Sequence, residues 1–268
     1  MGGSSVIGER IVPEQFRVAK KQYLLYLRHY FIYDWALGRI DSGANLLEVG
    51  CGEGYGTDMF ARKIAKVTGL DLNEEAVAHA SARYAADNCE FTSYDGTRFP
   101  FNTETFDAAV SFQVIEHVDD DAMFVAEISR VLKPGGMLLM TTPNRLLRLD
   151  PGQTPWNRYH KREYSPADLK EVLSAKFSGV QICAIKGSPE VQRVLTSNLR
   201  ANNPVAAALK RHMSESLKLS LLRLKAALPS FLGGDRKREY LEKYSYHDFS
   251  VVAGEAGGGL DLLAICRK

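Results

Sequence analysis

The chain has 268 residues, and its 34 lysine and arginine residues nearly balance 32 aspartate and glutamate residues, for a net charge of +2. This balance gives no electrostatic reason to expect a nucleic-acid partner. The composition, 45% hydrophobic and 25% charged, is typical of a folded domain with a sizeable core, and no apolar run is long enough to cross a bilayer.

The start of the chain and its cysteines favour a cytoplasmic protein. The first ten residues, MGGSSVIGER, lack the apolar segment of a signal peptide. The four cysteines lie far apart and form no C-x-x-C pair, so we expect reduced, buried thiols and no metal site. They are Cys51, Cys89, Cys183 and Cys266.

Strand-like and helix-like segments alternate after an aromatic, helical stretch at 13–37. The expected strands are NLLEVG near 45, KVTGLD near 66, CEFTSY near 89, FDAAVSF near 106, GGMLLMTT near 135 and VQICAI near 180. The expected helices cover 57–65, 74–86, 119–132 and 166–176. This alternation predicts an α/β fold with a mostly parallel sheet that helices cover on both faces.

The alternation breaks after about Gly187. Residues 188–243 are helical in pattern and basic, with 11 lysine and arginine residues against 5 aspartate and glutamate residues, and LDLLAICRK at 260–268 then returns as an apolar strand. We therefore expect an N-terminal helical cap (1–40), a core (41–187), a helical insertion or lid (188–243) and a segment with the final strand (244–268).

The insertion carries one apolar stripe with helical spacing. It consists of Leu209, Met213, Leu217, Leu221, Leu224 and Leu228. One interpretation is packing against the body of the protein or in a homodimer. The other is a basic amphipathic lid, which contacts a membrane surface through 204–228 or covers an acidic ligand.

The stretch LLEVGCGEGYGT (46–57) places alternate glycines directly after a strand. Such glycines permit either a tight turn alone or close approach of the backbone to a ligand. The dinucleotide pattern G-x-G-x-x-G fails here, because Tyr55 and Thr57 stand at the third glycine position. A pyrophosphate is therefore not the obvious ligand.

Three carboxylates accompany the expected strand ends, namely Glu48, Asp71 and Asp95. In an open α/β sheet, the carboxyl ends of neighbouring strands meet in one crevice. A carboxylate at the position of Asp71 can accept hydrogen bonds from both hydroxyls of a ribose. The three groups together suit a nucleoside that carries a cationic chain.

Five segments in this order resemble the class I S-adenosylmethionine-dependent methyltransferases. They are LLEVGCGEGYGT, GLDLNEEAV, SYDGTRFPF, FDAAVSFQVIEHVDD and EISRVLKPGGMLLMTTPN, within about 45–144. The resemblance implies a Rossmann-like sheet of seven strands with an antiparallel last strand. It also implies S-adenosyl-L-methionine as cofactor and S-adenosyl-L-homocysteine as product.

The same resemblance implies a set of cofactor-binding residues. Glu48 and the glycine loop would hold the methionine part, Asp71 the ribose, and Asp95 with Gly96 the border of the adenine. The end of the fourth strand would line the other side. The full set is Glu48, Gly50, Cys51, Gly52, Gly54, Tyr55, Asp71, Leu72, Asp95, Gly96, Phe112 and Gln113.

The flanks GERIVPEQ and WNRYHKREYSPADL (156–169) are similar to those of bacterial methyltransferases associated with polysaccharide and glycan biosynthesis. The acceptor implied is the hydroxyl of a sugar or another small molecule. Methylation of nitrogen or carbon is an alternative, as is a protein that binds the cofactor without catalysis. FQVIEH stands where nucleic-acid methyltransferases carry an aromatic N-P-P-type motif, so we expect no nucleic-acid acceptor.

Two histidines are candidate bases for removing a hydroxyl proton, and this chemistry needs no metal. His117 follows the fourth strand, where the reacting methyl group should lie, although a fold-supporting Glu-His pair is the alternative. His160 lies in the loop after the fifth strand. That loop is either part of the acceptor site or an entry to the next helix, with Ser165 as its cap.

Four further residues are candidates for binding the acceptor: Asn144, Trp156, Glu163 and Tyr164. Glu163 and Tyr164 would orient His160 or bind acceptor hydroxyls. Trp156 either stacks on a sugar ring or anchors its loop in the core. Asn144 has a neutral turn residue as its alternative interpretation.

Overall fold

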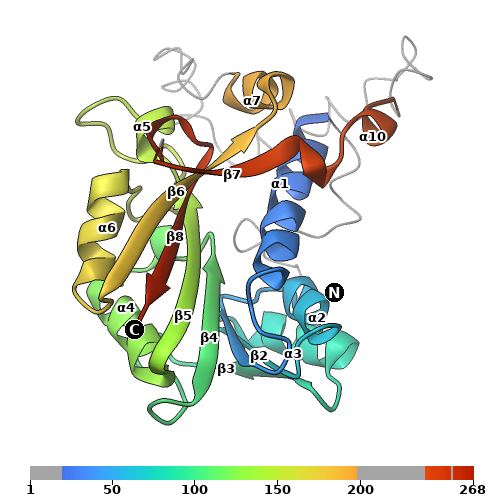
Figure 1. Cartoon of the computed structure of the whole chain (residues 1–268), viewed down its shortest axis with the longest axis vertical. Coiled ribbons are helices and arrows are strands. Elements are labelled where there is room, and N and C mark those ends of the chain that lie inside the picture. Colours follow the sequence, from blue (N-terminus) through green and yellow to red (C-terminus); the bar gives the residue numbers. More distant parts are fainter. Residues whose placement is uncertain (1–19, 198–238, 255) are drawn as a thin grey trace, which may run out of the picture.

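A computed structural model describes residues 20–197, 239–254 and 256–268. Their strands form one sheet in the order β3-β2-β1-β4-β5-β8-β6-β7 (Figure 1). The strands are β1 (Asn45–Val49), β2 (Lys66–Asp71), β3 (Cys89–Ser93), β4 (Phe106–Phe112), β5 (Leu132–Pro143), β6 (Gly179–Gly187), β7 (Phe249–Ala253) and β8 (Asp261–Arg267).

The pairing follows the expected scheme with one added strand. Strands β1 to β5 pair in parallel, and β8 lies antiparallel between β5 and β6. The expected antiparallel last strand is thereby confirmed. The count of seven is corrected to eight, because β7 pairs antiparallel with β6 at the sheet edge. Strand β5 begins at Leu132, before the GGMLLMTT run near 135 that predicted it.

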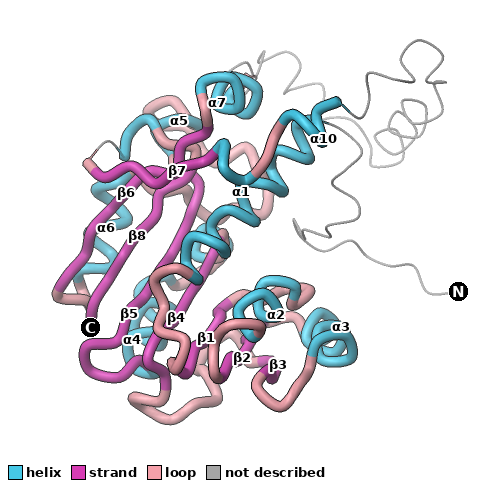
Figure 2. Tube along the Cα trace, turned by 45° about the vertical axis from the view of Figure 1, so that its right-hand side comes forward, coloured by secondary structure: helices cyan, strands magenta, loops and turns pink. Residues whose placement is uncertain are grey.

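Helices cover both faces of the sheet, as the alternation predicted. They are α1 (Lys20–Leu37), α2 (Tyr55–Ala61), α3 (Glu74–Tyr84), α4 (Asp121–Val131), α5 (Arg145–Arg148), α6 (Pro166–Ser174), α7 (Pro189–Thr196) and α10 (Glu239–Lys243). Figure 2 shows α1, α2 and α3 on one face and α4 and α6 on the other. Two separate hydrophobic clusters form the core on these two faces.

Local capping explains where several helices begin. The side chain of Asn73 accepts a hydrogen bond from the amide of Ala76 at the start of α3. Ser165 and Asp168 form a capping box at α6, which confirms Ser165 as a cap. Each such cap contributes about 1 kcal/mol to stability.

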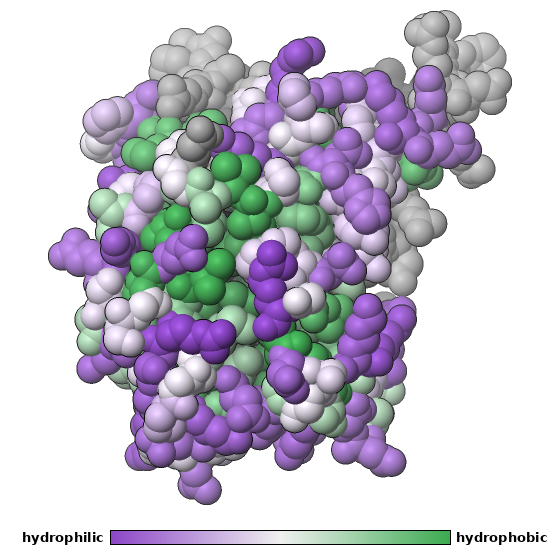
Figure 3. Space-filling model, in the orientation of Figure 1, coloured by the Kyte–Doolittle hydropathy of each residue, from purple (hydrophilic) through white to green (hydrophobic). Residues whose placement is uncertain are grey.

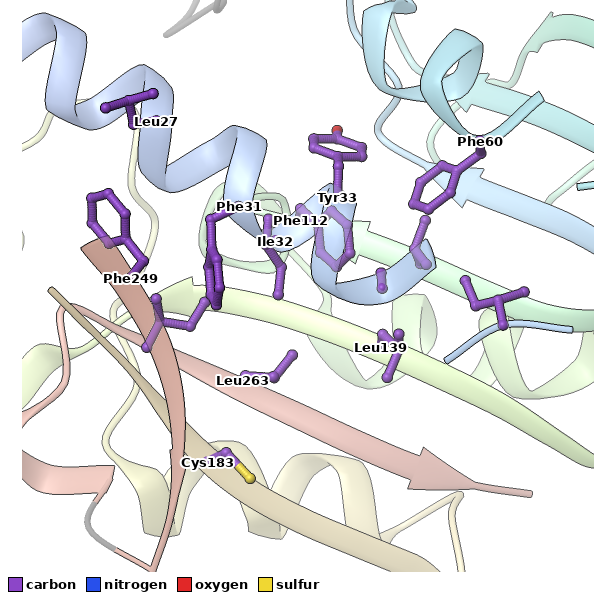
Figure 4. Packing of buried hydrophobic residues seen from close by; sticks show 14 of the residues in the cluster. Leu27, Phe31, Ile32, Tyr33, Phe60, Phe112, Leu139, Cys183, Phe249 and Leu263 are labelled. Atoms are coloured by element: carbon purple, nitrogen blue, oxygen red, sulfur yellow. The ribbon is translucent and has the colours of Figure 1, made fainter. Parts of the chain in front are cut away.

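The aromatic stretch near the N-terminus becomes α1, which packs across the sheet. Leu27, Phe31 and Ile32 point from this helix toward β8, β5 and Phe249 of β7 (Figure 4). Burial of one such side chain contributes about 1.5–3 kcal/mol relative to its exposed state. The packing therefore holds α1 over the carboxyl ends of β4 and β5.

The expected insertion is only partly within the described residues. Helices α7 and α10 lie at its two ends, which agrees with its helical pattern. The apolar stripe and the expected membrane contact at 204–228 lie outside the described residues. In the part that the structure describes, no helix is both long and apolar enough to span a membrane. Figure 3 shows hydrophobic side chains at the surface over β6 and β8.

Candidate active site

The glycine loop after β1 has the backbone conformation that its composition predicted. Gly50, Gly52 and Gly54 have φ values of 82°, 51° and 80°, which side chains rarely adopt. A Cβ atom at Gly50 would lie 2.3 Å from Val114, whereas one at Gly52 would meet nothing within 4 Å. The loop is therefore packed on one side and open at Gly52, where a ligand has room to approach.

Gly56 serves packing within the protein. A Cβ atom there would lie 2.2 Å from the ring of Tyr33, which descends from α1. The Tyr33 ring also contacts Tyr55 and, edge-on at 5.1 Å between centroids, Phe112. Tyr33 thus closes the space between α1, α2 and the end of β4.

Glu48 is buried, with 1% of its surface exposed. Its two carboxylate oxygens accept hydrogen bonds from the hydroxyl groups of Tyr33 and Thr57, each at 2.6 Å. Burial raises the pKa of Glu48 to about 7, although these two hydrogen bonds oppose the rise. Glu48 therefore joins α1, β1 and α2, and its contact with the methionine part of the cofactor stays a prediction.

Asp71 fixes the glycine loop from the end of β2. One carboxylate oxygen accepts a hydrogen bond from the amide of Gly52 at 2.8 Å, and the other accepts one from the amide of Asn73 at 2.9 Å. A carboxylate offers about four acceptor positions, so two remain for ribose hydroxyls. Asp71 therefore links the open loop to a place for a ribose.

Leu72 and Gly96 lie together beside Asp71. Leu72 is 58% exposed, which is unusual for a leucine at a strand end. A Cβ atom at Gly96 would lie 3.2 Å from the Leu72 side chain. The two residues leave a small apolar surface next to the acceptor positions of Asp71, which suits the flat face of an adenine.

Asp95 is exposed and turns toward its own loop. It accepts hydrogen bonds from the hydroxyl and amide groups of Thr97 and from the amide of Arg98. These bonds, the Thr97 hydroxyl above all, lower the pKa of Asp95. Its carboxylate is therefore charged at neutral pH, and a contact with adenine stays a prediction.

Two other expected cofactor residues lie at the loop, of which Cys51 is buried and Tyr55 is partly buried. Burial raises the pKa of the Cys51 thiol above the usual range. Burial likewise raises the pKa of the Tyr55 phenol. Neither group is ionised at neutral pH, so both contribute shape rather than charge.

The end of β4 holds a strained residue. Gln113 has a φ of 60°, and its amide donates a hydrogen bond to the carbonyl of Thr141 at 2.9 Å. Left-handed conformations at residues other than glycine cost about 1–3 kcal/mol and cluster at functional sites. The strained turn lets Gln113 line a pocket next to Phe112.

That pocket is a shallow, partly open hollow between α1 and the ends of β4, β5 and β8. It is lined by Arg28, His29, Ile32, Gln113, Thr141, Ile185 and Asp261. Its two charged residues, Arg28 and Asp261, were not predicted from the sequence. No local motif marks either residue, because they lie at opposite ends of the chain.

Asp261 is the buried acid of this pocket. One of its oxygens lies 3.2 Å from Nε of Arg28, and the other, Oδ1, has no hydrogen-bond partner among the described residues. Burial raises the pKa of Asp261, while Arg28 and Arg148 oppose the rise. A buried carboxylate oxygen without a donor suits a hydroxyl or amine of a ligand.

The two candidate bases lie side by side, outside the residues that line the pocket. The rings of His117 and His160 meet edge-on, with 4.9 Å between centroids. Nδ1 of His117 lies 3.0 Å from the carbonyl oxygen of Tyr159, and Nδ1 of His160 lies 2.8 Å from a Glu163 oxygen. Because these oxygens only accept, each Nδ1 carries the proton, and in the neutral imidazole Nε2 carries the lone pair.

Glu116 completes this cluster. Its buried carboxylate accepts a hydrogen bond from the Thr142 hydroxyl at 2.9 Å. Burial raises the pKa of Glu116 to about 7, and His160 opposes the rise. One potential ligand atom from each of Glu116, His117 and His160 lies within 4.8 Å of the others.

The predicted acceptor residues have mainly internal partners. Asn144 is fully buried: its oxygen caps α5, and its amide group donates to the carbonyls of Ala256, Gly257 and Gly259. The Tyr164 hydroxyl donates to Asp121 at 2.8 Å. Nothing in these surroundings favours acceptor contact at either residue.

Glu163 and Trp156 flank Arg148. Glu163 is buried and accepts hydrogen bonds from Nε of Arg148 at 3.0 and 3.1 Å. It therefore orients His160, as one of our interpretations held. Trp156 is 47% exposed under the guanidinium of Arg148, so it is not a buried anchor.

Comparisons with known proteins relate this chain to methyltransferases. Residues 47–140 match the family model of a methyltransferase domain. A probable S-adenosylmethionine-dependent methyltransferase of Mycolicibacterium smegmatis is 42% identical over 167 residues, which are 62% of each chain. Another, from Mycobacterium tuberculosis, is 35% identical over 190 residues, 70% of this chain and 66% of the relative.

A solved structure shows the same architecture over nearly the whole chain. It is an S-adenosylmethionine-dependent methyltransferase of Thermotoga maritima, described as a possible histamine N-methyltransferase. The TM-score is 0.54 at 17% identity, and the match covers 92% of this chain and 93% of that one. The fold is that of the class I S-adenosylmethionine-dependent methyltransferases.

The methyltransferase fold implies S-adenosylmethionine as the cofactor, and the residues present fit it. The open face at Gly52, the free acceptor positions of Asp71 and the exposed Leu72 provide places for its three parts. The chain spans less than two thirds of the length of the two mycobacterial relatives. The activity of the whole protein is therefore a proposal.

Proposed function

We propose that this protein transfers a methyl group from S-adenosylmethionine to a hydroxyl of a small molecule. The observation that carries the cofactor half is the hydrogen bond from the Gly52 amide to Asp71. It joins the open glycine loop to the acid that would hold the ribose. When bound, S-adenosylmethionine supplies a methyl group on a positively charged sulfur, which makes the group susceptible to in-line attack.

The pocket under α1 is the proposed acceptor site. It begins at Gln113, directly after Phe112, on the side of β4 at which the cofactor loop ends. Asp261 would accept a hydrogen bond from the acceptor, and Arg28 would hold its carboxylate in place. Helix α1 would exclude water from this space, which strengthens both interactions.

His117 is the proposed base for the acceptor hydroxyl, and because it is not among the residues that line the pocket, the acceptor would have to extend from the pocket past Gln113 to reach it. The carbonyl of Tyr159 fixes the imidazole so that the lone pair is on Nε2, the atom that would take the proton. A positioned imidazole has an unperturbed pKa of about 6.5, so its neutral form is available at pH 7. The proton would move from the acceptor oxygen to Nε2 as the new oxygen–carbon bond forms. His160 is the second candidate.

One relative supports transfer to oxygen. A ubiquinone biosynthesis O-methyltransferase of Caulobacter vibrioides is 29% identical over 173 residues, 67% of its length. A glycan hydroxyl stays our proposal for the acceptor class on the strength of the flanking segments alone. Methylation of nitrogen or carbon is the alternative, because the Asp261 oxygen would accept a hydrogen bond from an amine equally well.

A transfer assay with methyl-labelled cofactor tests the proposal. Sugars and glycans, phenols, lipids with free hydroxyls, and amines would be offered separately to the full chain. We expect labelled product from a hydroxyl compound and S-adenosylhomocysteine in equal amount. Tight binding of S-adenosylhomocysteine with no turnover of any compound would instead favour a binding protein without catalysis. Sedimentation of the same sample would test whether the chain forms the homodimer that is one interpretation of the apolar stripe.

A further inference from the structure

The Glu116, His117 and His160 cluster is built from two separate segments. Glu116 and His117 lie in a short 3-10 turn, η2 (Ile115–His117), directly after β4, and His160 comes from the loop before α6. Backbone hydrogen bonds join the segments, because the amide of Lys161 donates to the carbonyl of Glu116 at 2.8 Å. The cluster is thus fixed from both sides.

Both imidazoles present the atom that metals bind. The carbonyl of Tyr159 holds Nδ1 of His117, and the carboxylate of Glu163 holds Nδ1 of His160. Histidines that bind metals usually donate their other ring N–H to a carbonyl or a carboxylate in this way. In the neutral imidazole, each Nε2 then carries the lone pair with which it would bind an ion.

Glu163 is itself held in position. Arg148 donates to both of its oxygens, and the Glu163 side chain is fully buried. His160 therefore has a rigid carboxylate partner, which increases the basicity of the imidazole and fixes its orientation. A histidine that only filled space in the loop would not need a partner held in this way.

We propose that Glu116, His117 and His160 together bind one divalent transition-metal ion, with zinc as the ion best suited to this donor set. Two imidazoles with one carboxylate and an open position are a familiar zinc ligand set. Ions that prefer oxygen alone, such as magnesium, suit it poorly. This proposal differs from our expectation from the sequence that the chemistry needs no metal, and the zinc-binding experiment below decides between them.

The distances require only a small closure. Tetrahedral zinc with bonds of about 2.0–2.1 Å places its ligand atoms about 3.3 Å apart. The three ligand atoms here lie within 4.8 Å of one another. The three side chains would have to move toward the ion by the difference between these two spacings.

Metal binding and the proposed base role use the same lone pair of His117. In the metal-free protein Nε2 of His117 takes the proton, whereas in the metal-bound protein the ion would hold the acceptor hydroxyl and lower its pKa. This consequence rests on the proposed function. The binding itself does not, and it can be measured without cofactor or acceptor.

Zinc binding to the full chain tests the proposal. Protein stripped with a chelator would be dialysed against zinc ions alone, and bound zinc would be measured as a function of free zinc. We expect one ion per chain, and affinity at least tenfold weaker in His117→Ala and in Glu116→Gln. Glu163→Gln should weaken binding by about 10–100-fold, because it removes the partner of His160.

The matched control is His79→Ala. His79 is half exposed and pairs with Glu53 on the cofactor side, far from the cluster in the chain. We expect zinc affinity to be unchanged. Substoichiometric binding to the wild type, or binding that survives in His117→Ala but falls in His79→Ala, would overturn the proposal.

A second measurement on the wild type keeps the test valid if a variant fails to fold. X-ray absorption of the zinc-loaded chain should show only nitrogen and oxygen neighbours at about 2.0–2.2 Å, with the scattering of two imidazoles. Sulfur neighbours at about 2.3 Å would place the ion on the buried cysteines and overturn the proposal.

Discussion

The cofactor side and the acceptor side of the strand ends are built in different ways. On the cofactor side, Gly52, Asp71 and Leu72 lie within about twenty residues of one another, and backbone amides hold the acid in place. On the acceptor side, Arg28 and Asp261 meet from the two ends of the chain. One side is a local motif, and the other depends on the completed fold.

Because of this difference, we expect substitutions on the two sides to have different effects. A local loop that positions ligands by backbone amides binds the same cofactor in many proteins. The shape and charge of a pocket that is lined by residues of α1 and β8 change when a lining residue on either element is substituted. We therefore expect substitutions on the cofactor side to affect cofactor binding, and those on the acceptor side to affect turnover.

The largest expected effect comes from His117→Ala. Loss of a positioned base should lower kcat for the hydroxyl acceptor by about 10²–10⁴-fold, with binding of S-adenosylhomocysteine retained. Steady-state kinetics with labelled cofactor would measure it. His79→Ala, at an exposed position of α3, should leave kcat unchanged. A fall in kcat of only two- or threefold in His117→Ala would indicate that another group removes the proton of the acceptor hydroxyl.

A second expected effect concerns pH and Glu48. Its pKa is about 7 in the folded chain and near 4.5 in the unfolded chain, so the folded state binds the proton more tightly. The free energy of unfolding should therefore fall as pH rises from 4.5 to 7 and level off above it. The size of this change is about 3 kcal/mol.

Urea unfolding of Glu48→Gln at pH 5 and pH 8 would measure this contribution. The difference in stability between the two pH values should be about 2–3 kcal/mol smaller than in the wild type. Glu190→Gln is the control, because hydrogen bonds from Tyr244 and Lys243 lower the pKa of Glu190 to about 2 and remove it from this window. An unchanged pH dependence in Glu48→Gln would show that Glu48 is ionised in the folded protein.

A smaller effect separates two glycines of the same loop. Gly56→Ala should reduce stability by about 1–3 kcal/mol, because its Cβ meets the Tyr33 ring. Gly52→Ala should cost about 1–2 kcal/mol through backbone strain alone and should also weaken binding of S-adenosylhomocysteine. Thermal unfolding and calorimetry would measure both. If the two variants lost cofactor affinity equally, the claim that the loop is open to the cofactor at Gly52 and not at Gly56 would be wrong.

Six strands could be predicted because each contains a run of buried apolar residues. β3, in which only Cys89 is buried, was predicted from its place in the alternation of strands and helices. β7 was missed because it is a short edge strand in which only Phe249 is buried, and it lies beyond that alternation. Its pattern therefore resembles a loop more than a core strand. The sequence also signalled Glu48 as unusual inside an apolar strand, but not that Tyr33 and Thr57 would occupy its oxygens.

The cofactor loop could be predicted from spacing, whereas the pocket could not. The φ of Gln113 depends on how β4 ends against β5. No residue type in the sequence indicates that this glutamine adopts a left-handed conformation. Arg28 and Asp261 meet only after α1 packs on β8. Contacts of this kind follow from the completed topology and leave no periodic signal in the sequence.

Calorimetric binding of S-adenosylhomocysteine to Asp71→Ala and Asp261→Asn tests most directly that the two sides are separate sites. Each hydrogen bond to a charged group contributes roughly 1.5–3 kcal/mol, so Asp71→Ala should lose at least about tenfold in affinity. Asp261→Asn, whose side chain lies in the acceptor pocket, should bind like the wild type. Unchanged affinity in a folded Asp71→Ala protein, or an equal loss in Asp261→Asn, would contradict the account.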